Sequence, residues 1–510
     1  MEAIQEHVKT LGELKESGWQ SRSVKDEIRK NLMAKISNNE TLFEGIRGYD
    51  KTVIPQLQHA LLARHDFILL GLRGQGKSRI LRMLPEFMDE YLPIVSGSEI
   101  NDDPYHPLSR YANDLIAEKG DDTPIEWIHR SRRYGEKLAT PDTTVADLIG
   151  DVDPIKAASK RLTLGDENVI NFGLIPRTNR GIFVINELPD LQPRIQVALL
   201  NIMQERDIQI RGFNVRIPLD NVMAFSANPE DYTNRGNLIT PLKDRIDSQI
   251  ITHYPKELET GMQITTQEAW TVRHDDRTVH MPKLFEELIE FVAYEARQSE
   301  YIDQKSGVST RLPITATEQI ISATERRMLL NNEKESTVRV ADLYHMVPAL
   351  TGKLELVYEG EQEGAVNVAH HLIGKAINNV FKKQFPDPQK KKSEDDEVYG
   401  PIVNWFANGN QLDLPDKLSE KEYRNTLGQV DGLQEVAKKY GKPQGDQEKY
   451  VLMDLVLEAL HQNSMLGKED VDEQRSYTDM LGSMLGSLDN LDDLDDQDID
   501  NLDDLDDNLE

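Results

Sequence analysis

The 510-residue sequence contains no cysteine. Disulfide bonds, iron–sulfur clusters and thiolate zinc sites are therefore excluded. Long apolar runs are also missing, because stretches such as residues 67–71 fall far short of the roughly 20 apolar residues that a membrane span needs. The charged first residues, MEAIQEHVKTLGELKES, lack the apolar centre of a secretory signal. We therefore expect a cytoplasmic protein with no membrane span.

Positive charge is scarce as well. The chain has 59 lysines and arginines against 89 aspartates and glutamates, which gives a formal net charge of -30 at pH 7. Part of this charge is local, since residues 489–510 hold twelve acidic residues and no lysine or arginine, but the rest of the chain is also acidic. A nucleic-acid binder that works through bulk electrostatics needs a basic face. No nucleic-acid partner is therefore expected.

The pattern of apolar residues divides the chain into segments. Between residues 41 and 255, short apolar runs alternate with helical stretches, which is typical of a parallel sheet covered by helices on both faces. Beyond residue 255 the strand signals end and helical periodicity continues. The expected segments are an N-terminal helical extension (1–40), an α/β domain (41–255) with a polar insertion (about 94–165), a helical segment (256–385), a charged linker (386–397), a C-terminal helical segment (398–475) and an acidic low-complexity tail (476–510).

The strongest motif is Gly71-Leu-Arg-Gly-Gln-Gly-Lys77-Ser78, which fits the GxxxxGK[ST] pattern of a phosphate-binding loop. An apolar strand candidate precedes it and a helical stretch follows. The glycines let the backbone curl so that its N–H groups point at phosphate oxygens, and the helix N-terminus adds its dipole. Lys77 is expected to neutralise the β- and γ-phosphates, and Ser78 to ligate Mg²⁺. The predicted set for ATP is Gly71, Gly74, Gln75, Gly76, Lys77, Ser78 and Arg79.

A second strand candidate, residues 181–185, ends in Asn186-Glu187. A carboxylate beside a water molecule in a dry site accepts its proton, so Glu187 is the predicted general base. The usual residue before this glutamate is an aspartate that holds the Mg²⁺ shell. Asn186 can bind a metal-bound water but brings no charge, which predicts weaker Mg²⁺ binding or slower turnover. Alone, the pattern favours a plain helix start; beside a phosphate-binding loop it favours a site.

Three further polar residues follow in order. Asn228 leaves the strand candidate 222–226 and is expected to lie between the γ-phosphate and the attacking water. Arg245 lies in LKDRI and Arg311 in GVSTRLPIT. A desolvated guanidinium stabilises the charge on a transferring phosphoryl group. Taken singly, each arginine is better explained as a surface ion pair, but their order after the phosphate-binding loop favours catalytic roles.

The succession GLRGQGKS, LIGDVDP, FGLIPRTNRGIFVINELPDL, SANPED, LKDRID and GVSTR resembles the AAA+ ATPases, in the branch of the magnesium chelatase ATPase subunit and MoxR, over roughly residues 41–385. The resemblance implies a P-loop three-layer α/β/α core with an all-helical lid at 256–385. Residues 145–154 and 172–175 resemble the helix-2 insert of this branch, and residues 205–218 its pre-sensor hairpin.

The same resemblance assigns roles to the site. It implies that Lys77 and Ser78 form Walker A, Glu187 Walker B and Asn228 sensor 1, with Arg245 the arginine finger and Arg311 sensor 2. It also implies a ring, of six subunits in the family, and a client protein that commonly carries a von Willebrand factor A domain. Asn186 departs from the family's aspartate, which affects the expected rate of hydrolysis and not nucleotide binding.

Two functions remain open at this stage. One is an Mg-ATPase that remodels a partner, and the other is a nucleotide-gated scaffold with weak or absent hydrolysis. A transcription activator is disfavoured because the chain lacks a GAFTGA loop, and a helicase is disfavoured by the charge. His370-His371 has no third ligand nearby and is expected to be structural. The acidic tail lacks the glycine turn and terminal glutamate of a calcium loop, and fits a partner-binding motif or a solvating segment equally well.

Overall fold

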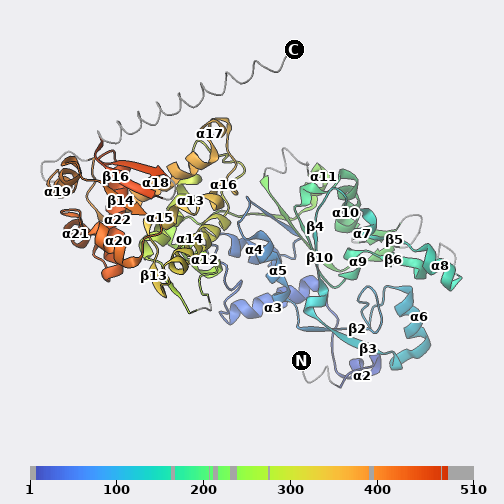
Figure 1. Cartoon of the computed structure of the whole chain (residues 1–510). Coiled ribbons are helices and arrows are strands. Elements are labelled where there is room, and N and C mark those ends of the chain that lie inside the picture. Colours follow the sequence, from blue (N-terminus) through green and yellow to red (C-terminus); the bar gives the residue numbers. More distant parts are fainter. Residues whose placement is uncertain are drawn as a thin grey trace, which may run out of the picture. The chain divides into compact units, whose positions relative to one another are not determined.

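The computed structural model describes residues 7–161, 167–205, 207–210, 216–229, 238–273, 276–389, 396–471 and 474–480. It consists of two compact units, Met1–Tyr254 and Pro255–Glu510. Figure 1 follows the first unit from blue to green and the second from yellow to red. Half of the predicted charged linker, residues 390–395, and residues 481–510 of the predicted acidic tail lie outside the described residues.

The first unit is built on a five-stranded sheet with the order β11-β1-β10-β7-β4. All four neighbouring pairs are parallel. The strands are β1 (Phe67–Leu70), β4 (Tyr134–Leu138), β7 (Gly181–Asn186), β10 (Asn221–Ala227) and β11 (Ser248–Ile251). The three strands expected from apolar runs, β1, β7 and β10, are the three inner strands of this sheet. β4 lies within the range that the sequence predicts as an insertion, so that range contains one edge of the central sheet.

Helices cover both faces of this sheet. One core contains Phe67, Leu69 and Val184 with residues of α3 (Val24–Ser37), α4 (Val53–Leu62) and α5 (Lys77–Met83). The opposite core contains Ile68, Phe183 and Phe225 with residues of α9 (Leu174–Arg177), α10 (Pro193–Glu205) and α11 (Thr240–Arg245). Neighbouring strand residues thus alternate between two apolar layers, as parallel strands buried on both faces do. The predicted three-layer α/β/α architecture is confirmed.

The N-terminal helices are part of this unit. α2 (Leu11–Glu16) begins with a capping box of Thr10 and Glu13. α3 is tied to the sheet by two buried ion pairs, Lys25 with Asp66 at 2.7 Å and Glu27 with Arg133 at 2.6 Å. The segment expected as an N-terminal extension therefore contributes side chains to the apolar core that contains Phe67 and Leu69 of β1.

The first unit also contains three short antiparallel strand pairs and several helices outside the central sheet. β2 (Tyr91–Val95) pairs with β3 (Ile125–His129), β5 (Gly150–Val152) with β6 (Ile170–Phe172), and β8 (Asp207–Gln209) with β9 (Arg216–Pro218), all antiparallel. The helices here are α6 (Arg110–Lys119), α7 (Val145–Leu148) and α8 (Pro154–Lys160). The β5–β6 pair coincides with the residues that resemble the helix-2 insert, and the β8–β9 pair with the predicted pre-sensor hairpin, of which residues 206 and 211–215 lie outside the described part.

The second unit is mainly helical. One apolar core runs through both predicted segments, 256–385 and 398–475, and its largest helices are α13 (Lys283–Ala296), α14 (Arg311–Leu330), α18 (Ala365–Gln384) and α22 (Asp446–Gln462). The other helices are α12 (Leu258–Glu268), α15 (Val340–Tyr344), α16 (Val347–Thr351), α17 (Tyr358–Glu363), α19 (Asp396–Ala407), α20 (Glu420–Leu427) and α21 (Leu433–Val436). His370 and His371 pack edge-on against Tyr344 and Tyr301, at ring distances of 5.5 and 6.2 Å.

The expectation that strands end at residue 255 is wrong. β12 (Thr278–His280) pairs with β13 (Glu335–Thr337), and β14 (Leu412–Pro415), β15 (Gly467–Val471) and β16 (Gln474–Thr478) form a three-stranded sheet in the order β14-β16-β15. These strands are short and mostly polar, as in the β15 sequence GKEDV, so they lack the apolar run that marks a strand in a sequence. No helix among the described residues has the length and apolar content to cross a bilayer.

Candidate nucleotide-binding site

The GxxxxGK[ST] segment forms the turn between β1 and α5. Gly74 and Gly76 have φ angles of 75° and 74°, a left-handed backbone that glycine adopts without steric cost. Gly71 is required for a different reason, because a Cβ atom there would lie 1.9 Å from the Thr252 hydroxyl oxygen. The structure therefore uses the glycines of the motif to build a tight, curled loop.

Side chains from outside the loop hold it in place. The Tyr49 hydroxyl donates to the Gln75 carbonyl at 2.9 Å, the Tyr254 hydroxyl to the Arg73 carbonyl at 2.9 Å, and the Thr252 hydroxyl to Gln75 Oε1 at 2.6 Å. Burial raises the pKa of Tyr49 to about 12, so its hydroxyl keeps the proton that it donates. Each of these hydroxyls fixes a carbonyl or amide oxygen of the loop.

Three of the predicted site residues, the ATP-binding Lys77 and the catalytic Asn228 and Glu187, meet at the carboxyl ends of β1, β10 and β7. Lys77 is only 6% exposed, and its Nζ donates to the carbonyls of Gly71 and Leu72 and to Asn228 Oδ1, the last at 2.7 Å. The Asn228 amide nitrogen in turn donates to Glu187 Oε2 at 2.9 Å. Lys77, Asn228 and Glu187 thus form one hydrogen-bonded chain.

The backbone of Glu187 is unusual. Its φ of 54° and ψ of 49° lie in the left-handed region, which costs a residue with a side chain on the order of 1 kcal/mol. Its N–H donates to the Ser226 hydroxyl at 3.3 Å, a contact between the ends of β7 and β10. The turn directs the carboxylate toward Asn228 immediately after the buried strand ends.

A second cluster surrounds Asn186. Its Oδ1 accepts from the Ser226 hydroxyl at 2.9 Å and from the Ser78 hydroxyl at 3.5 Å. Its Nδ2 donates to Glu136 Oε1 at 2.6 Å. Glu136 is also held by Arg82, whose guanidinium donates at 2.8 and 2.9 Å to the two carboxylate oxygens. Arg82 holds the pKa of Glu136 below its usual range, so the carboxylate is charged near neutral pH.

Sequence reasoning missed Glu136 and Arg82. Glu136 lies on β4, an edge strand whose residues YGEKL show no apolar run. Arg82 follows Ser78 by four residues on α5, a spacing that places both side chains on one helix face. That spacing is the one signal in the sequence that relates Arg82 to the site.

Arg245 and Arg79 lie outside these two clusters. Arg245 is the last residue of α11, and among the described residues its guanidinium donates to Gln204 Oε1 at 2.7 and 2.9 Å and to the Pro241 carbonyl at 2.9 Å. Arg79 is exposed on α5. Arg311 is the exposed first residue of α14, in the second unit.

These residues fit a nucleoside triphosphate with its Mg²⁺. A curled glycine loop and a nearly buried amine suit phosphate oxygens, and the Ser78 hydroxyl suits a hard cation. The described residues contain no group of three or more acidic or histidine side chains that could hold a metal ion by themselves. Mg²⁺ keeps several waters and is usually bound through one or two carboxylates together with substrate phosphates, so a cage of protein ligands alone is not needed here.

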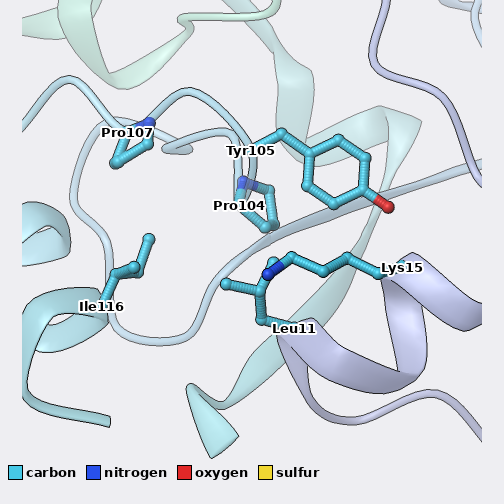
Figure 2. Close-up of a pocket in the computed structure, with 6 residues that line it drawn as sticks. All are labelled: Leu11, Lys15, Pro104, Tyr105, Pro107 and Ile116. Atoms are coloured by element: carbon cyan, nitrogen blue, oxygen red, sulfur yellow. The ribbon is translucent and has the colours of Figure 1, made fainter. Parts of the chain in front are cut away.

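One surface hollow of about 520 Å³ lies elsewhere in the first unit. Its lining residues are Leu11, Lys15, Pro104, Tyr105, Pro107 and Ile116. Figure 2 shows Lys15 and Tyr105 on one side of it, with Pro107 and Ile116 on the other. None of the predicted site residues lines this hollow.

The chain matches no family model. It is 29% identical over 217 residues to the magnesium-chelatase 38 kDa subunit of Cereibacter sphaeroides, a match that covers 41% of this chain and 57% of that one. The corresponding subunit of Rhodobacter capsulatus is 26% identical over 208 residues, which cover 39% and 51% of the two chains. The chain thus spans about half the length of the curated relatives it matches.

Solved structures are more distant. An ATPase structure from Cytophaga hutchinsonii is 18% identical, covers 71% of this chain and 97% of its own, and has a TM-score of 0.29. A structure of the complex between subunits BchI and BchD of magnesium chelatase is 18% identical, covers 63% and 98%, and has a TM-score of 0.33.

A parallel sheet in which the inner strand β1 runs into a GxxxxGK[ST] loop, with an asparagine and a glutamate at the ends of the next two strands, defines a P-loop nucleotide-binding protein of the ATPase type. The chelatase subunits as sequence relatives, together with the motif order, support an AAA+ ATPase of the branch that contains the magnesium chelatase ATPase subunit and MoxR.

Proposed function

We propose that this chain is an Mg²⁺-dependent ATP hydrolase. The observation that carries the proposal is the chain Lys77–Asn228–Glu187, in which an amine, an amide and a carboxylate are joined by hydrogen bonds of 2.7 and 2.9 Å. An amine that binds phosphate and a carboxylate that accepts a proton from water are the two groups that hydrolysis needs on opposite sides of the γ-phosphate. Asn228 lies between them.

Each residue of the proposed site has one task. Lys77 binds and neutralises phosphate oxygens, Asn228 orients the attacking water, and Glu187 accepts its proton. The loop residues 71–76 hold the phosphates through their backbone, and Ser78 and Asn186 would hold the metal and its water. Bound Mg²⁺ supplies charge neutralisation at the phosphates.

We further propose that the active form is a ring in which Arg245 acts on the nucleotide of the neighbouring subunit and Arg311 acts as sensor 2. The position of Arg245 at the end of α11 supports its proposed action on a neighbour's nucleotide. Among the described residues its guanidinium donates to Gln204 and Pro241, neither of which belongs to the proposed site. These partners are neutral oxygens, and a phosphate binds a guanidinium more strongly because it is charged.

A mixing experiment tests the shared site. The Glu187→Gln chain keeps Arg245, and the Arg245→Ala chain keeps Glu187, so a mixed assembly contains interfaces that combine both intact groups. Mixing the two inactive variants is expected to restore part of the phosphate release. If Arg245 acts within its own chain, the mixture stays as inactive as its components.

The hydrolysis cycle would remodel a partner protein. In this branch we propose a partner with a von Willebrand factor A domain, whose metal site accepts a carboxylate from the acidic tail (476–510). The tail ends in a run of Leu and Asp residues and carries no basic residue from 489 on, which suits a metal-centred acceptor. A pull-down with a chain truncated after residue 480, which keeps β16 (Gln474–Thr478), is expected to lose the partner; unchanged recovery would overturn this docking mode.

The second candidate function is a nucleotide-gated scaffold that binds ATP and hydrolyses it slowly or not at all. Asn186 favours it, because the residue that faces Ser78 is neutral. Steady-state phosphate release separates the two functions. A rate that falls at least 100-fold in Glu187→Gln supports the hydrolase, with nucleotide binding retained as the control. A wild-type rate equal to that of Glu187→Gln supports the scaffold.

A further inference from the structure

The side-chain amide of Asn186 can point only one way. The Glu136 carboxylate has no proton to donate, so the Asn186 atom that lies 2.6 Å from it must be the NH₂ group. The Oδ1 atom then faces the two serine hydroxyls, Ser226 at 2.9 Å and Ser78 at 3.5 Å. Glu136 therefore turns the oxygen of Asn186 toward the proposed metal ligand Ser78.

The same contact carries charge. Glu136 is ionised, since Arg82 donates to both of its oxygens, and its side chain is only 20% exposed. A charge-assisted hydrogen bond at 2.6 Å polarises the amide and increases the negative charge on the oxygen at its other end. Asn186 thus becomes a stronger acceptor than an isolated asparagine.

The two residues also occupy matching places in the sheet. β4 lies next to β7 in parallel register. Leu138 of β4 is opposite Asn186 of β7, and Glu136 precedes Leu138 by two residues on β4. Side chains two residues apart on a strand point to the same face. The Glu136 carboxylate therefore lies on the strand next to β7. The side-chain amide of Asn186 separates it from the position where this class of site normally carries an aspartate.

We propose that Glu136 is a positioning residue of the magnesium site, which orients Asn186 and supplies the negative charge that Asn186 lacks. This inference rests on the proposed function, because it needs Mg²⁺-nucleotide at Ser78. The adjacent pair Glu136–Asn186 would do the work of a single aspartate. With this pair in place, the asparagine at position 186 is compatible with Mg²⁺ binding.

Manganese binding, measured by electron paramagnetic resonance with a non-hydrolysable ATP analogue present, tests the inference without reference to turnover. Removal of an outer partner of a metal ligand lowers metal affinity by about 10- to 100-fold. We expect this loss in Glu136→Gln, which removes the charge and keeps the shape. The double variant Glu136→Gln/Asn186→Asp moves the carboxylate to the end of β7 and is expected to restore the affinity to within about threefold of wild type, a recovery that follows from the same outer-partner effect.

Arg82→Gln distinguishes metal positioning from a structural ion pair. It breaks the same Arg82–Glu136 pair but leaves the carboxylate, so the metal affinity is expected to stay at or above that of the wild type. Equal losses in Arg82→Gln and Glu136→Gln would overturn the inference. Glu126→Gln, on β3 beside Arg132, is the matched control and should change nothing.

Failure of the proposed function and failure of the inference about Glu136 give different binding results. If wild-type protein binds no ATP analogue, with or without metal, the nucleotide site itself is refuted. If wild type binds analogue and metal, and Glu136→Gln binds both equally well, only the role of Glu136 is refuted. Thermal unfolding of each variant shows whether a lost affinity reflects a lost fold, and the recovery in the double variant must occur for the inference to stand.

Discussion

The side-chain amide of Asn228 donates to the carboxylate of Glu187 at 2.9 Å. Its oxygen accepts from Lys77 at the same time, at 2.7 Å, so the proposed base and the proposed phosphate-binding amine share one amide. A phosphate that draws Lys77 toward itself removes one of the hydrogen bonds that fix Asn228. The position of the base is in this way linked to the occupancy of the loop.

Replacement of Asn228 tests this link. Asn228→Ala is expected to lower steady-state phosphate release by about 100-fold, the usual loss when one preorganised donor is removed from a reacting centre. ATP affinity should change little, because Lys77 and the loop backbone remain. Asn171→Ala, an exposed asparagine on β6, is the control. A rate within twofold of wild type would show that Asn228 has no part in the reaction.

The close approach at Gly71 gives a second prediction. A Cβ atom there would lie 1.9 Å from the Thr252 hydroxyl and 2.2 Å from Gln75 Oε1, so Gly71→Ala must displace the contact that fixes the loop. We expect a loss of ATP affinity of at least about tenfold, which corresponds to roughly 1.4 kcal/mol. Gly445→Ala, with no atom within 4 Å, is the control in a fluorescence titration with an ATP analogue. Equal affinities would contradict the predicted clash.

A third prediction concerns the buried pair of Arg133 and Glu27. Arg133 is 0% exposed, and its guanidinium donates to both Glu27 oxygens at 2.6 and 2.8 Å and to the Arg180 carbonyl at 2.8 Å. Removal of one partner leaves the other charge buried, which costs about 3–5 kcal/mol. Arg133→Met should therefore lower the urea midpoint of the first unit sharply.

The exposed pair of Arg64 and Asp26 is the matched control for this experiment. Their hydrogen bond of 2.9 Å is similar in length, but the side chains are 56% and 46% exposed. Such pairs contribute about 0–1 kcal/mol. Arg64→Met should hardly move the midpoint, and a shift as large as that of Arg133→Met would contradict the argument from burial.

A fourth prediction is a pH effect at Glu458 of α22. Burial alone would raise its pKa, but the charge of Lys468 and the hydroxyls of Tyr344 and Tyr477 outweigh it and lower the pKa from 4.5 to about 2. A lowered folded-state pKa means that the carboxylate stabilises the fold fully above pH 4.5 and loses this contribution as the pH falls toward 2. The shift corresponds to roughly 3 kcal/mol.

Urea unfolding of the second unit at several pH values between 7 and 2.5 measures this contribution. Glu458→Gln should be less stable than wild type at pH 7, and the difference should shrink as the pH approaches 2. The exposed Glu435→Gln on α21 serves as the control. A constant difference across this range would show that packing, and not ionisation, accounts for the effect of the substitution.

Lys77, Ser78, Glu187 and Asn228 could be predicted from the sequence for one physical reason. Glu187 and Asn228 follow directly on apolar runs, and Lys77 and Ser78 follow one through the glycine loop; parallel strands bring their carboxyl ends to one edge of a sheet. The strands β1, β7 and β10 are apolar because helices cover both of their faces, so their signal is strong.

Glu136 and the strands of the second unit could not be found in this way. β4 is an edge strand with exposed and half-buried residues, and the sequences of β15 (GKEDV) and β16 (QRSYT) contain no apolar run. The order of the strands in a sheet also cannot be predicted from local sequence patterns, because it depends on which apolar surfaces pack together in the folded chain. The closeness of Glu136 to Asn186 depends on β4 lying beside β7, a relationship between residues 50 positions apart.

The residues that hold the phosphate-binding loop also end the first unit. Thr252 and Tyr254 bind Gln75 and Arg73, and the chain enters the second unit at Pro255. Because these hydrogen bonds are direct, a displacement of the loop is transmitted to residues 252–254, the last three of the first unit. The C-terminal end of that unit is therefore coupled to the state of the phosphate-binding loop.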